Sequence, residues 1–257
     1  MNRSLCRVSV CLATFNGSAF IDQHLASILA QLGPDDELIV SDDASTDGTC
    51  ERVEALRDPR IRLYRSHYRR GHSKNFARAL GIATGDLIFL CDQEDVWHPD
   101  KLAAVKDVFA LHAEVSMVHH GRVLTDMEGL PIGEGAEFGA GIRQGAAFIG
   151  SEFLRAPLWG CCMALRAEAV RQMLPFPRSV HAHHHWATAV AALGGGIYLL
   201  PEPLISHRQQ GTNITSKKRP PITRHWSVRL RLLTMLASAW WRTHYRQNAS
   251  GRETGRG

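Results

Sequence analysis

The first half of the chain alternates short β-rich runs with stretches of helical periodicity, and this alternation restricts the fold more than any other feature. Strands are expected at Arg7–Ala13, Glu37–Ser41, Arg60–Tyr64 and Asp86–Cys91. Helices are expected between them, at Ser18–Leu32, Thr46–Leu56 and Ser73–Ala83. Such alternation is typical of a mostly parallel sheet covered by helices on both faces. We therefore predict an α/β fold.

The second half has a weaker pattern. A helix is expected from Pro99 to about His112, and a strand at Ser116–His119. Residues 121–157 are rich in glycine and have no clean period, so a long loop with local strands is expected there. Two more helices and a short strand follow, at Arg166–Leu174, His185–Leu193 and Ile197–Leu200.

Size and composition place the chain among globular proteins. With 257 residues, 44% of them hydrophobic, it can bury the core of one α/β domain or of two tightly joined halves. No run reaches 18 apolar residues, so neither a transmembrane helix nor a signal peptide is expected. The six cysteines include no CxxC pair, which favours free thiols and a cytoplasmic protein.

The net charge of +5 conceals an asymmetry between the body and the tail. Residues 1–202 hold 19 Lys and Arg against 24 Asp and Glu, whereas residues 203–257 hold 11 against one. A uniformly basic nucleic-acid-binding domain would not divide its charge in this way. We therefore expect a mildly acidic, enzyme-like body with a cationic docking segment, and no nucleic-acid partner.

Acidic residues follow two of the expected strands. Asp42 and Asp43 come after the second strand, and Asp92, Glu94 and Asp95 after the fourth. Ligands of open parallel sheets bind at the carboxyl ends of the strands. No GxGxxG follows the first strand and no P-loop motif occurs. Carboxylates on the second turn could instead share a Mg or Mn ion with a diphosphate, although turn formation and helix capping are the alternative.

The ordered set of motifs resembles the family 2 glycosyltransferases of GT-A fold, particularly their bacterial rhamnosyltransferase-like branch. The resemblance spans about residues 8–213. It is carried by Leu12–Gly17, Ser27–Leu29, Ser41–Gly48, Asn75–Phe76, Gly85–Trp97, Gly160–Cys161, Leu174–Pro177 and Arg208–Gln209. It implies a GT-A type sheet flanked by helices. It also implies transfer of a sugar from a nucleotide diphosphate donor to a cell-surface glycan or a lipid-linked acceptor.

The resemblance also implies donor-binding roles in the first half. Thr14 and Phe15 would border the nucleotide, and Asp42 and Asp43 would hold the base and ribose. The turn after the fourth strand corresponds to the family's DxD-type motif.

Within that motif, Asp92 would face the nucleotide-sugar and contribute to the metal site, with Glu94 or Asp95 as a metal ligand. Glu94 stands where the family more often has Asp, which keeps the charge but lengthens the arm. Trp97 would wall the sugar pocket, with packing in the core as the alternative.

The expected catalytic base is where the sequence departs from the family. The family usually has His-Asp-x-Trp, with the Asp as base, and this chain has His183-His184-His185-Trp186. His184 occupies the Asp position, and a neutral imidazole can accept a proton at cytoplasmic pH. His183, His185, Asp95 or an inactive enzyme are the alternatives.

Two further departures concern metal binding. Gln210 stands where the family often has a metal- or diphosphate-binding His, for which His207 could compensate. A zinc or nickel site made by His181 and His183–His185 is the other interpretation of the histidine cluster. Cys161 and Cys162 are expected to be buried small hydrophobes rather than nucleophiles.

The tail predicts an amphipathic helix. Its apolar side holds Trp226, Leu230, Leu233, Ala237, Trp240 and Trp241, with Arg231 and Arg242 on the other side. A cationic helix with tryptophans suits the surface of an anionic membrane. Packing of the apolar stripe on the enzyme body is the alternative.

Together these features predict an inverting, metal-dependent glycosyltransferase at the inner face of the cell membrane. Residues 1–215 would form the GT-A domain, with a nucleotide-sugar-binding half (1–98) and an acceptor half (99–215), followed by the basic tail (216–257). The rival hypothesis is a catalytically silent relative that binds nucleotide or serves as an assembly partner, which His184 and Gln210 suggest.

Overall fold

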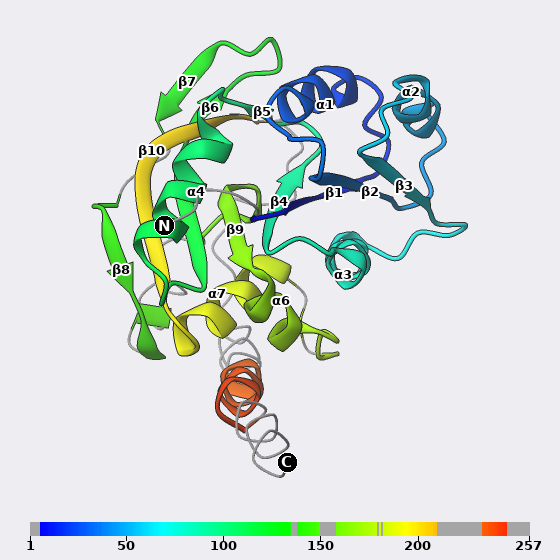
Figure 1. Ribbon diagram of the computed structural model, residues 1–257. Helices are drawn as coiled ribbons and strands as arrows, with labels where there is room; N and C mark the ends of the chain where they lie inside the picture. Colours follow the sequence, from blue (N-terminus) through cyan, green and yellow to red (C-terminus); the bar gives the residue numbers. More distant parts are fainter. Residues whose placement is uncertain are drawn as a thin grey trace, which may run out of the picture.

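The computed structural model describes residues 6–134, 138–146, 148–149, 158–178, 180, 182–209 and 233–245. Its first half has the expected alternation of strands and helices (Figure 1). The strands are β1 (Val8–Thr14), β2 (Glu37–Asp42), β3 (Ile61–Arg65) and β4 (Leu87–Asp92). The helices between them are α1 (Ile21–Leu29), α2 (Thr49–Ala55) and α3 (His72–Ile82).

The second half adds antiparallel strands to this sheet. Its elements are β5 (Val96–Trp97), α4 (Lys101–Leu111), β6 (Met117–Thr125), β7 (Pro131–Glu134), β8 (Gly141–Arg143), a 3₁₀ turn (Gly160–Cys162), β9 (Met163–Arg166), α6 (Ala167–Met173), α7 (His183–Leu193) and β10 (Ile197–Arg208). The sheet order is β3-β2-β1-β4-β9-β6-β10-β5, with β7 beside β6 and β8 beside β10. The pairs among β1 to β4 are parallel, and β9 runs antiparallel to both β4 and β6. The predicted α/β fold with a mostly parallel sheet is confirmed.

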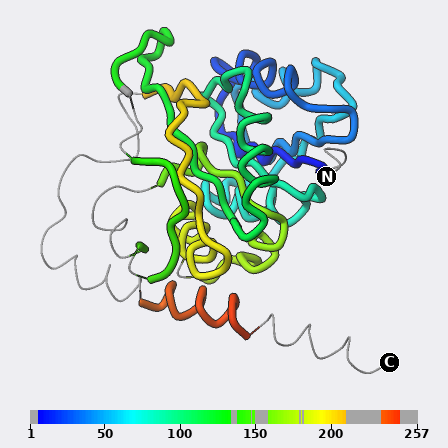
Figure 2. The backbone as a smooth tube through the Cα atoms, turned by 60° about the vertical axis from the view of Figure 1, so that its left-hand side comes forward, coloured from blue at the N-terminus to red at the C-terminus, as the bar shows by residue number. Residues whose placement is uncertain are grey.

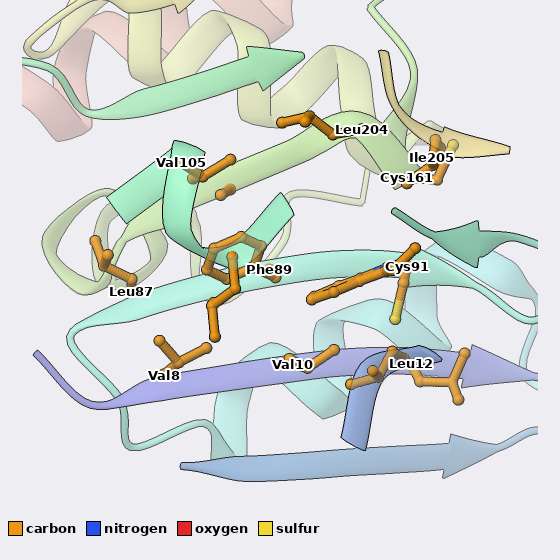
Figure 3. Packing of buried hydrophobic residues seen from close by; sticks show 14 of the residues in the cluster. Val8, Val10, Leu12, Leu87, Phe89, Cys91, Val105, Cys161, Leu204 and Ile205 are labelled. Atoms are coloured by element: carbon orange, nitrogen blue, oxygen red, sulfur yellow. The ribbon is translucent and has the colours of Figure 1, made fainter. Parts of the chain in front are cut away.

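Helices cover both faces of the sheet, as predicted. Alternate residues of each strand point to opposite faces, so one strand supplies two cores. In Figure 3, Val8 and Val10 of β1 and Phe89 of β4 point to the same face, which α1, α2 and α4 cover. On the other face, α3, α6 and α7 cover Cys11, Ile39 and other residues. All six cysteines are free thiols, and Cys161 and Cys162 are buried, as predicted.

Three predicted elements of the second half need correction. β6 continues well past His119 to Thr125, so the expected loop 121–157 begins with the end of a central strand. β7 and β8 are the local strands expected in that segment. β10 runs for 12 residues to Arg208 instead of ending at Leu200. α7 begins at His183, so all three consecutive histidines are helical. β5 and β9 were not predicted at all.

The helix at residues 233–245 confirms the predicted helical tail in part. It packs on the body through Met235, Ala239 and Thr243, which are 6%, 0% and 2% exposed. Arg242 donates hydrogen bonds to the carbonyls of Gln172 and Met173 at the end of α6. Figure 2 shows the helix at one end of the molecule, with the β6–β7 hairpin at the other. Residues 216–232 of the predicted tail lie outside the described residues.

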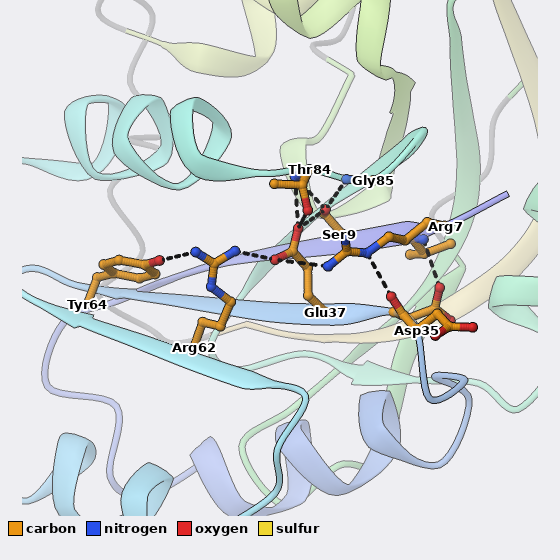
Figure 4. A network of polar contacts seen from close by, with 10 residues as sticks. Arg7, Ser9, Asp35, Glu37, Arg62, Tyr64, Thr84 and Gly85 are labelled. Atoms are coloured by element: carbon orange, nitrogen blue, oxygen red, sulfur yellow. Dashed lines mark hydrogen bonds and ion pairs between the residues drawn. The ribbon is translucent and has the colours of Figure 1, made fainter. Parts of the chain in front are cut away.

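A buried carboxylate joins the strands at the amino edge of the parallel sheet (Figure 4). Glu37 accepts hydrogen bonds from Ser9, from the backbone and hydroxyl of Thr84, and from Arg62. Burial favours the neutral acid, but these donors outweigh it and lower the pKa of Glu37 to about 2. Glu37 therefore holds three segments together in its charged form.

Candidate functional site

The candidate site lies at the carboxyl edge of the parallel strands, on the edge opposite to Glu37. β1, β2 and β4 are adjacent and parallel, and they end at Thr14, Asp42 and Asp92. The strand register therefore brings these three predicted site residues to one edge of the sheet. The segments that follow each strand form the rest of the site.

The two carboxylates after β2 make hydrogen bonds within the protein. Asp42 accepts from the Thr14 hydroxyl at 3.0 Å and from the backbone and hydroxyl of Ser45. Asp43 accepts from the backbone N–H groups of Arg70 and Gly71, at 2.7 and 2.9 Å. Both carboxylates are almost fully buried. They shape the loops that border the site. Their contact with base and ribose stays a prediction.

Phe15 is fixed from two sides. The Gln93 side chain accepts from its backbone N–H at 2.8 Å and donates to its carbonyl at 3.0 Å. The Arg69 guanidinium lies 3.9 Å from the centroid of the Phe15 ring. Gly17 leaves room for Gln93, because a Cβ at this position would lie 2.3 Å from the Gln93 Oε1 atom. The loop after β1 is thereby tied to the carboxylate turn after β4.

Asp92 and Glu94 differ in their electrostatic surroundings. His72, in the first turn of α3, places its Nε2 atom 3.1 Å from Asp92 Oδ1. Burial opposes the charge on Asp92, but His72 and the nearby His183 and His207 hold the pKa of Asp92 below its usual range. For Glu94, burial and the charges of Asp92 and Asp95 raise the pKa to about 8.

Asp95 pairs with a histidine of β10. It is fully buried, and its Oδ1 atom lies 2.7 Å from Nδ1 of His207 on β10. Burial would discharge the imidazolium, but Cys161 and Asp95 outweigh it and raise the pKa of His207 to about 11. The Asp95 backbone carbonyl lies 2.5 Å from Nδ1 of His24. Asp95 thus joins the carboxylate turn to β10 and α1.

Trp97 occupies the core. It is 3% exposed, its ring lies 5.5 Å from that of Phe89, and β5 pairs it with Ile205. The ammonium of the fully buried Lys101 lies 4.1 Å from its centroid and donates to the Cys161 carbonyl. This position corresponds to the core-packing alternative rather than to a wall of the sugar pocket.

The three histidines of α7 have different surroundings. His183 is 2% exposed and stacks on Phe76 at 4.1 Å, and Gly160 makes room for its ring. His184 is half-buried, and it interacts electrostatically with Asp92 and His72 on the donor side. Burial and the neighbouring His185 lower the pKa of His184 to about 4, so it is neutral near pH 7.

The carboxylate turn offers the donor atoms that a divalent cation prefers. Asp92 and Glu94 have hard oxygen atoms, and a cation would relieve part of the effect of burial and neighbouring charge that raises the pKa of Glu94. Oδ2 of Asp95 is buried and has no hydrogen-bond partner among the described residues.

The structure does not gather the three predicted ligands into one set. Within the described part of the chain, only Asp95, Cys161 and His207 hold three ligating atoms within 4.8 Å. His183–His185 form no such group, and His181 and Gln210 lie outside the described residues.

Sequence reasoning missed several polar residues around the site. His72 contacts Asp92 from 20 positions away, and its exposed position at a helix start carries no sequence signal. His119 and Arg122 lie on β6, in or beside the expected loop, and both are buried. The one sequence signal for His119 and Arg122 was that both are titratable residues in or next to a β-rich run.

The mostly parallel sheet with helices on both faces is a GT-A-like fold, as in the solved structures described below. The sequence matches the family model described as "Glycosyl transferase family 2" over residues 9–173, which is more than half of the chain. The chain therefore belongs to glycosyl transferase family 2. The predicted enzyme class, a glycosyltransferase, agrees with this membership.

Two curated relatives illustrate the range of the family. The chain is 25% identical over 217 residues to an uncharacterized glycosyltransferase of Nostoc, alr2836. The aligned region covers 80% of this chain and 66% of that protein. It thus spans slightly less than two thirds of that relative. A dTDP-rhamnosyl transferase of Shigella flexneri, RfbG, is 35% identical over 98 residues, or 35% of this chain and 34% of that protein.

Solved structures have the same fold. Staphylococcus aureus TarS 1–349 with UDP-GlcNAc has a TM-score of 0.67 at 18% identity, over 92% of this chain and 72% of that one. The mannosyltransferase PcManGT of Pyrobaculum calidifontis, in complex with GDP-Man and Mn²⁺, has a TM-score of 0.58 at 22% identity, over 91% and 73%. At these identities the likeness concerns the fold. Among the described residues, no helix has the length and apolar character that a membrane crossing requires.

Proposed function

We propose that this protein is an inverting, metal-dependent glycosyltransferase that moves a sugar from a nucleotide diphosphate donor to a cell-surface glycan or lipid-linked acceptor. The observation that carries the proposal is the position of Asp92 and Glu94 at the carboxyl edge of the sheet, with His184 within electrostatic range of Asp92. Residues 1–98 would bind the donor and residues 99–215 the acceptor.

The donor would lie along the carboxyl edge of β1 and β2. Phe15, held by Gln93, presents a fixed ring beside Thr14, and the buried Asp42 and Asp43 hold the flanking loops. dTDP-rhamnose is our leading donor, because the motifs resemble the rhamnosyltransferase branch and because the partial relative from Shigella is named as a dTDP-rhamnosyl transferase.

Mg or Mn would be held by Asp92 and Glu94, on the side of the turn that faces the donor. When bound, such an ion would stabilise the negative charge on the departing nucleoside diphosphate. Asp95 was predicted as a metal ligand, but we propose a different role for it. It is already paired with His207 and would orient the turn.

His184 would accept the proton of the attacking acceptor hydroxyl. Its neutral state at pH 7 leaves a ring nitrogen free to accept, and general base catalysis typically contributes a factor of about 10² to 10⁴. We therefore expect His184→Ala to slow release of the nucleoside diphosphate about 100-fold or more. His184→Asp, which restores the family's usual residue, should recover much of the rate. The assay is turnover of dTDP-rhamnose and UDP-sugars with Mn²⁺ and a crude lipid acceptor extract.

His112→Ala is the matched control, since His112 follows α4 and packs on Tyr198 away from the site. Unchanged turnover in His184→Ala would move the base to His183, His185 or Asp95. No turnover of any donor by the unaltered protein, despite nucleotide binding, would favour the silent-relative hypothesis.

We further propose that the protein works at the cytoplasmic membrane surface through its tail. The helix at 233–245 leaves Leu233, Trp240, Trp241 and Tyr245 between 48% and 63% exposed, whereas Met235 and Ala239 are buried. Residues 203–257 hold 11 basic residues and one acidic residue. Exposed aromatics beside positive charge favour an anionic lipid surface. This face is the predicted apolar stripe, and the body contacts the helix on another face.

We expect Trp240→Ala/Trp241→Ala to weaken binding to vesicles of phosphatidylglycerol and phosphatidylcholine at least tenfold, because the loss of two interfacial aromatic rings removes apolar area from the membrane contact. Co-sedimentation measures the partition. Leu111→Ala is the control, since Leu111 is 79% exposed at the end of α4. Equal partition of the double variant and the unaltered protein would refute the proposal.

A further inference from the structure

Arg122 is a buried cation without an anionic partner among the described residues. Arg122 is 6% exposed, and its Nε and Nη1 atoms have no hydrogen-bond partner in the described part of the chain. A guanidinium stays charged at any physiological pH, and burial of such a charge without a partner is costly. The contact that the structure does supply is the Trp159 ring, whose centroid lies 3.9 Å from the guanidinium carbon.

The strand register places Arg122 at the same edge of the sheet as the carboxylate turn. β9 pairs Ala164 with Phe89 on β4 and with Val118 on β6, so Phe89 and Val118 lie at the same level of the sheet. Asp92 follows Phe89 by three positions, and Arg122 follows Val118 by four, toward the same edge. Two strand spacings separate the rows by about 10 Å.

Side chains fill the gap in a defined order. The Trp159 ring lies between Arg122 and His207, with its centroid 6.0 Å from the imidazole, and His207 is paired with Asp95. On the other side, His119 accepts a hydrogen bond from the Trp159 backbone and interacts electrostatically with both Arg122 and His184. Arg122 is therefore linked to His207 through Trp159 and to the proposed base through His119.

His119 adds a second polar atom without a partner. Its Nδ1 is buried and makes no hydrogen bond to any described residue. Burial and the charge of Arg122 lower the pKa of His119 to about 3, so the ring is neutral. A neutral imidazole beside a guanidinium can bind a polar group without adding a second positive charge. Two side chains with unsatisfied polar atoms thus lie three positions apart on β6 and interact electrostatically.

We propose that Arg122 recognises an anionic group of the acceptor, so that the acceptor substrate is a negatively charged glycan or glycolipid. This inference rests on the proposed function, whose acceptor class it specifies. An anion would satisfy the free N–H groups of Arg122 with charge-assisted hydrogen bonds, which are stronger than neutral ones. The anion is either the carboxylate of an acidic sugar or the phosphate of a lipid carrier, since both have the same chemistry.

The test measures binding rather than turnover. Saturation-transfer NMR is recorded on the full chain with the donor site filled by nucleoside diphosphate and Mg²⁺. The probes are methyl β-glucuronide, N-acetylglucosamine 1-phosphate and neutral methyl β-glucoside. We expect at least one anionic probe to bind tenfold or more tightly than the neutral one, and Arg122→Met to abolish that preference. The preferred anion identifies the source, an acidic sugar or a carrier phosphate.

Arg171→Met is the matched control, since Arg171 is exposed and paired with Glu168 on α6. Arg122→Lys should retain part of the preference because it keeps the charge. Arg122→Met should fold at least as stably as the unaltered protein, because an apolar chain of similar length replaces an unpaired buried cation. Equal binding of neutral and anionic probes, or a preference that survives in Arg122→Met, would overturn the inference. Failure of the proposed function would appear separately, as absence of turnover in the His184 assay.

Discussion

Replacing Asp92 by Asn is expected to reduce sugar transfer about 1,000-fold while the protein remains folded. Asn has nearly the same shape but cannot carry the negative charge that holds a divalent cation. Loss of one electrostatic contact to the transition state typically costs a factor of about 10² to 10³, and loss of a charged metal ligand adds to it. Asp92 is held in its charged state by His72, so the substitution removes a full charge at neutral pH.

The rate is measured as nucleoside diphosphate release, and calorimetry with nucleoside diphosphate and Mn²⁺ reports donor binding. Asp100→Asn is the control, because Asp100 is an exposed residue at the start of α4 whose side chain makes no capping hydrogen bond. Near-normal turnover in Asp92→Asn would remove the carboxylate turn from the mechanism. If Mn²⁺ strengthened nucleotide binding only weakly in both the unaltered protein and Asp92→Asn, the result would argue against a metal at this position.

Replacing Glu37 by Gln is expected to lower the free energy of unfolding by about 3 kcal/mol at pH 7. The folded pKa of Glu37 is about 2 and its ordinary pKa is 4.5, and a tenfold change in proton affinity corresponds to about 1.4 kcal/mol. Because the folded pKa is lowered, this stabilisation is complete above pH 4.5 and is lost as the pH falls toward 2. Gln has no charge for Arg62 and should abolish this acid dependence.

Urea unfolding at a series of pH values measures both effects. Glu51→Gln is the control on the same chemistry, since Glu51 is 65% exposed and its contact with Arg65 is a surface ion pair. Such pairs contribute about 1 kcal/mol or less. A Glu37→Gln protein with unchanged stability and an unchanged acid transition would show that the donors around Glu37 are satisfied equally well by an amide.

The sequence predicts the parallel half of the fold well because local and global preferences agree there. β1, β2 and β4 are short, mostly apolar runs, β3 alternates apolar and charged residues, and helices of regular period separate the strands. β10 shows why the other half is harder. Pro201 and Pro203 indicate a strand end, yet the strand continues through shifts of register beside Leu200 and Pro203. Tertiary pairing with β6 overrides the local signal.

The site shows the same division. Residues at strand ends, such as Asp42 and Asp92, could be placed at one edge from the sequence, because parallel strands share that edge. Contacts between distant segments could not. Asp95 pairs with His207 across 112 positions, and Trp159 brings Arg122 toward the same region. Neither pairing follows from periodicity or turn chemistry, so the sequence predicted Asp95 as a metal ligand and left Arg122 unassigned.

The antiparallel pairing of β5 with β10 has a consequence for how such an enzyme diversifies. Val96 and Trp97 follow the carboxylate turn directly, and they pair with Ser206 and Ile205, beside His207. Strand pairing thus fixes the separation between the proposed donor-binding turn and the proposed acceptor half, independently of the loops on either side. Exchange of the β6–β7 hairpin between relatives could therefore alter acceptor choice without disturbing the alignment of the reacting groups, which makes this hairpin a rational place to graft new specificity.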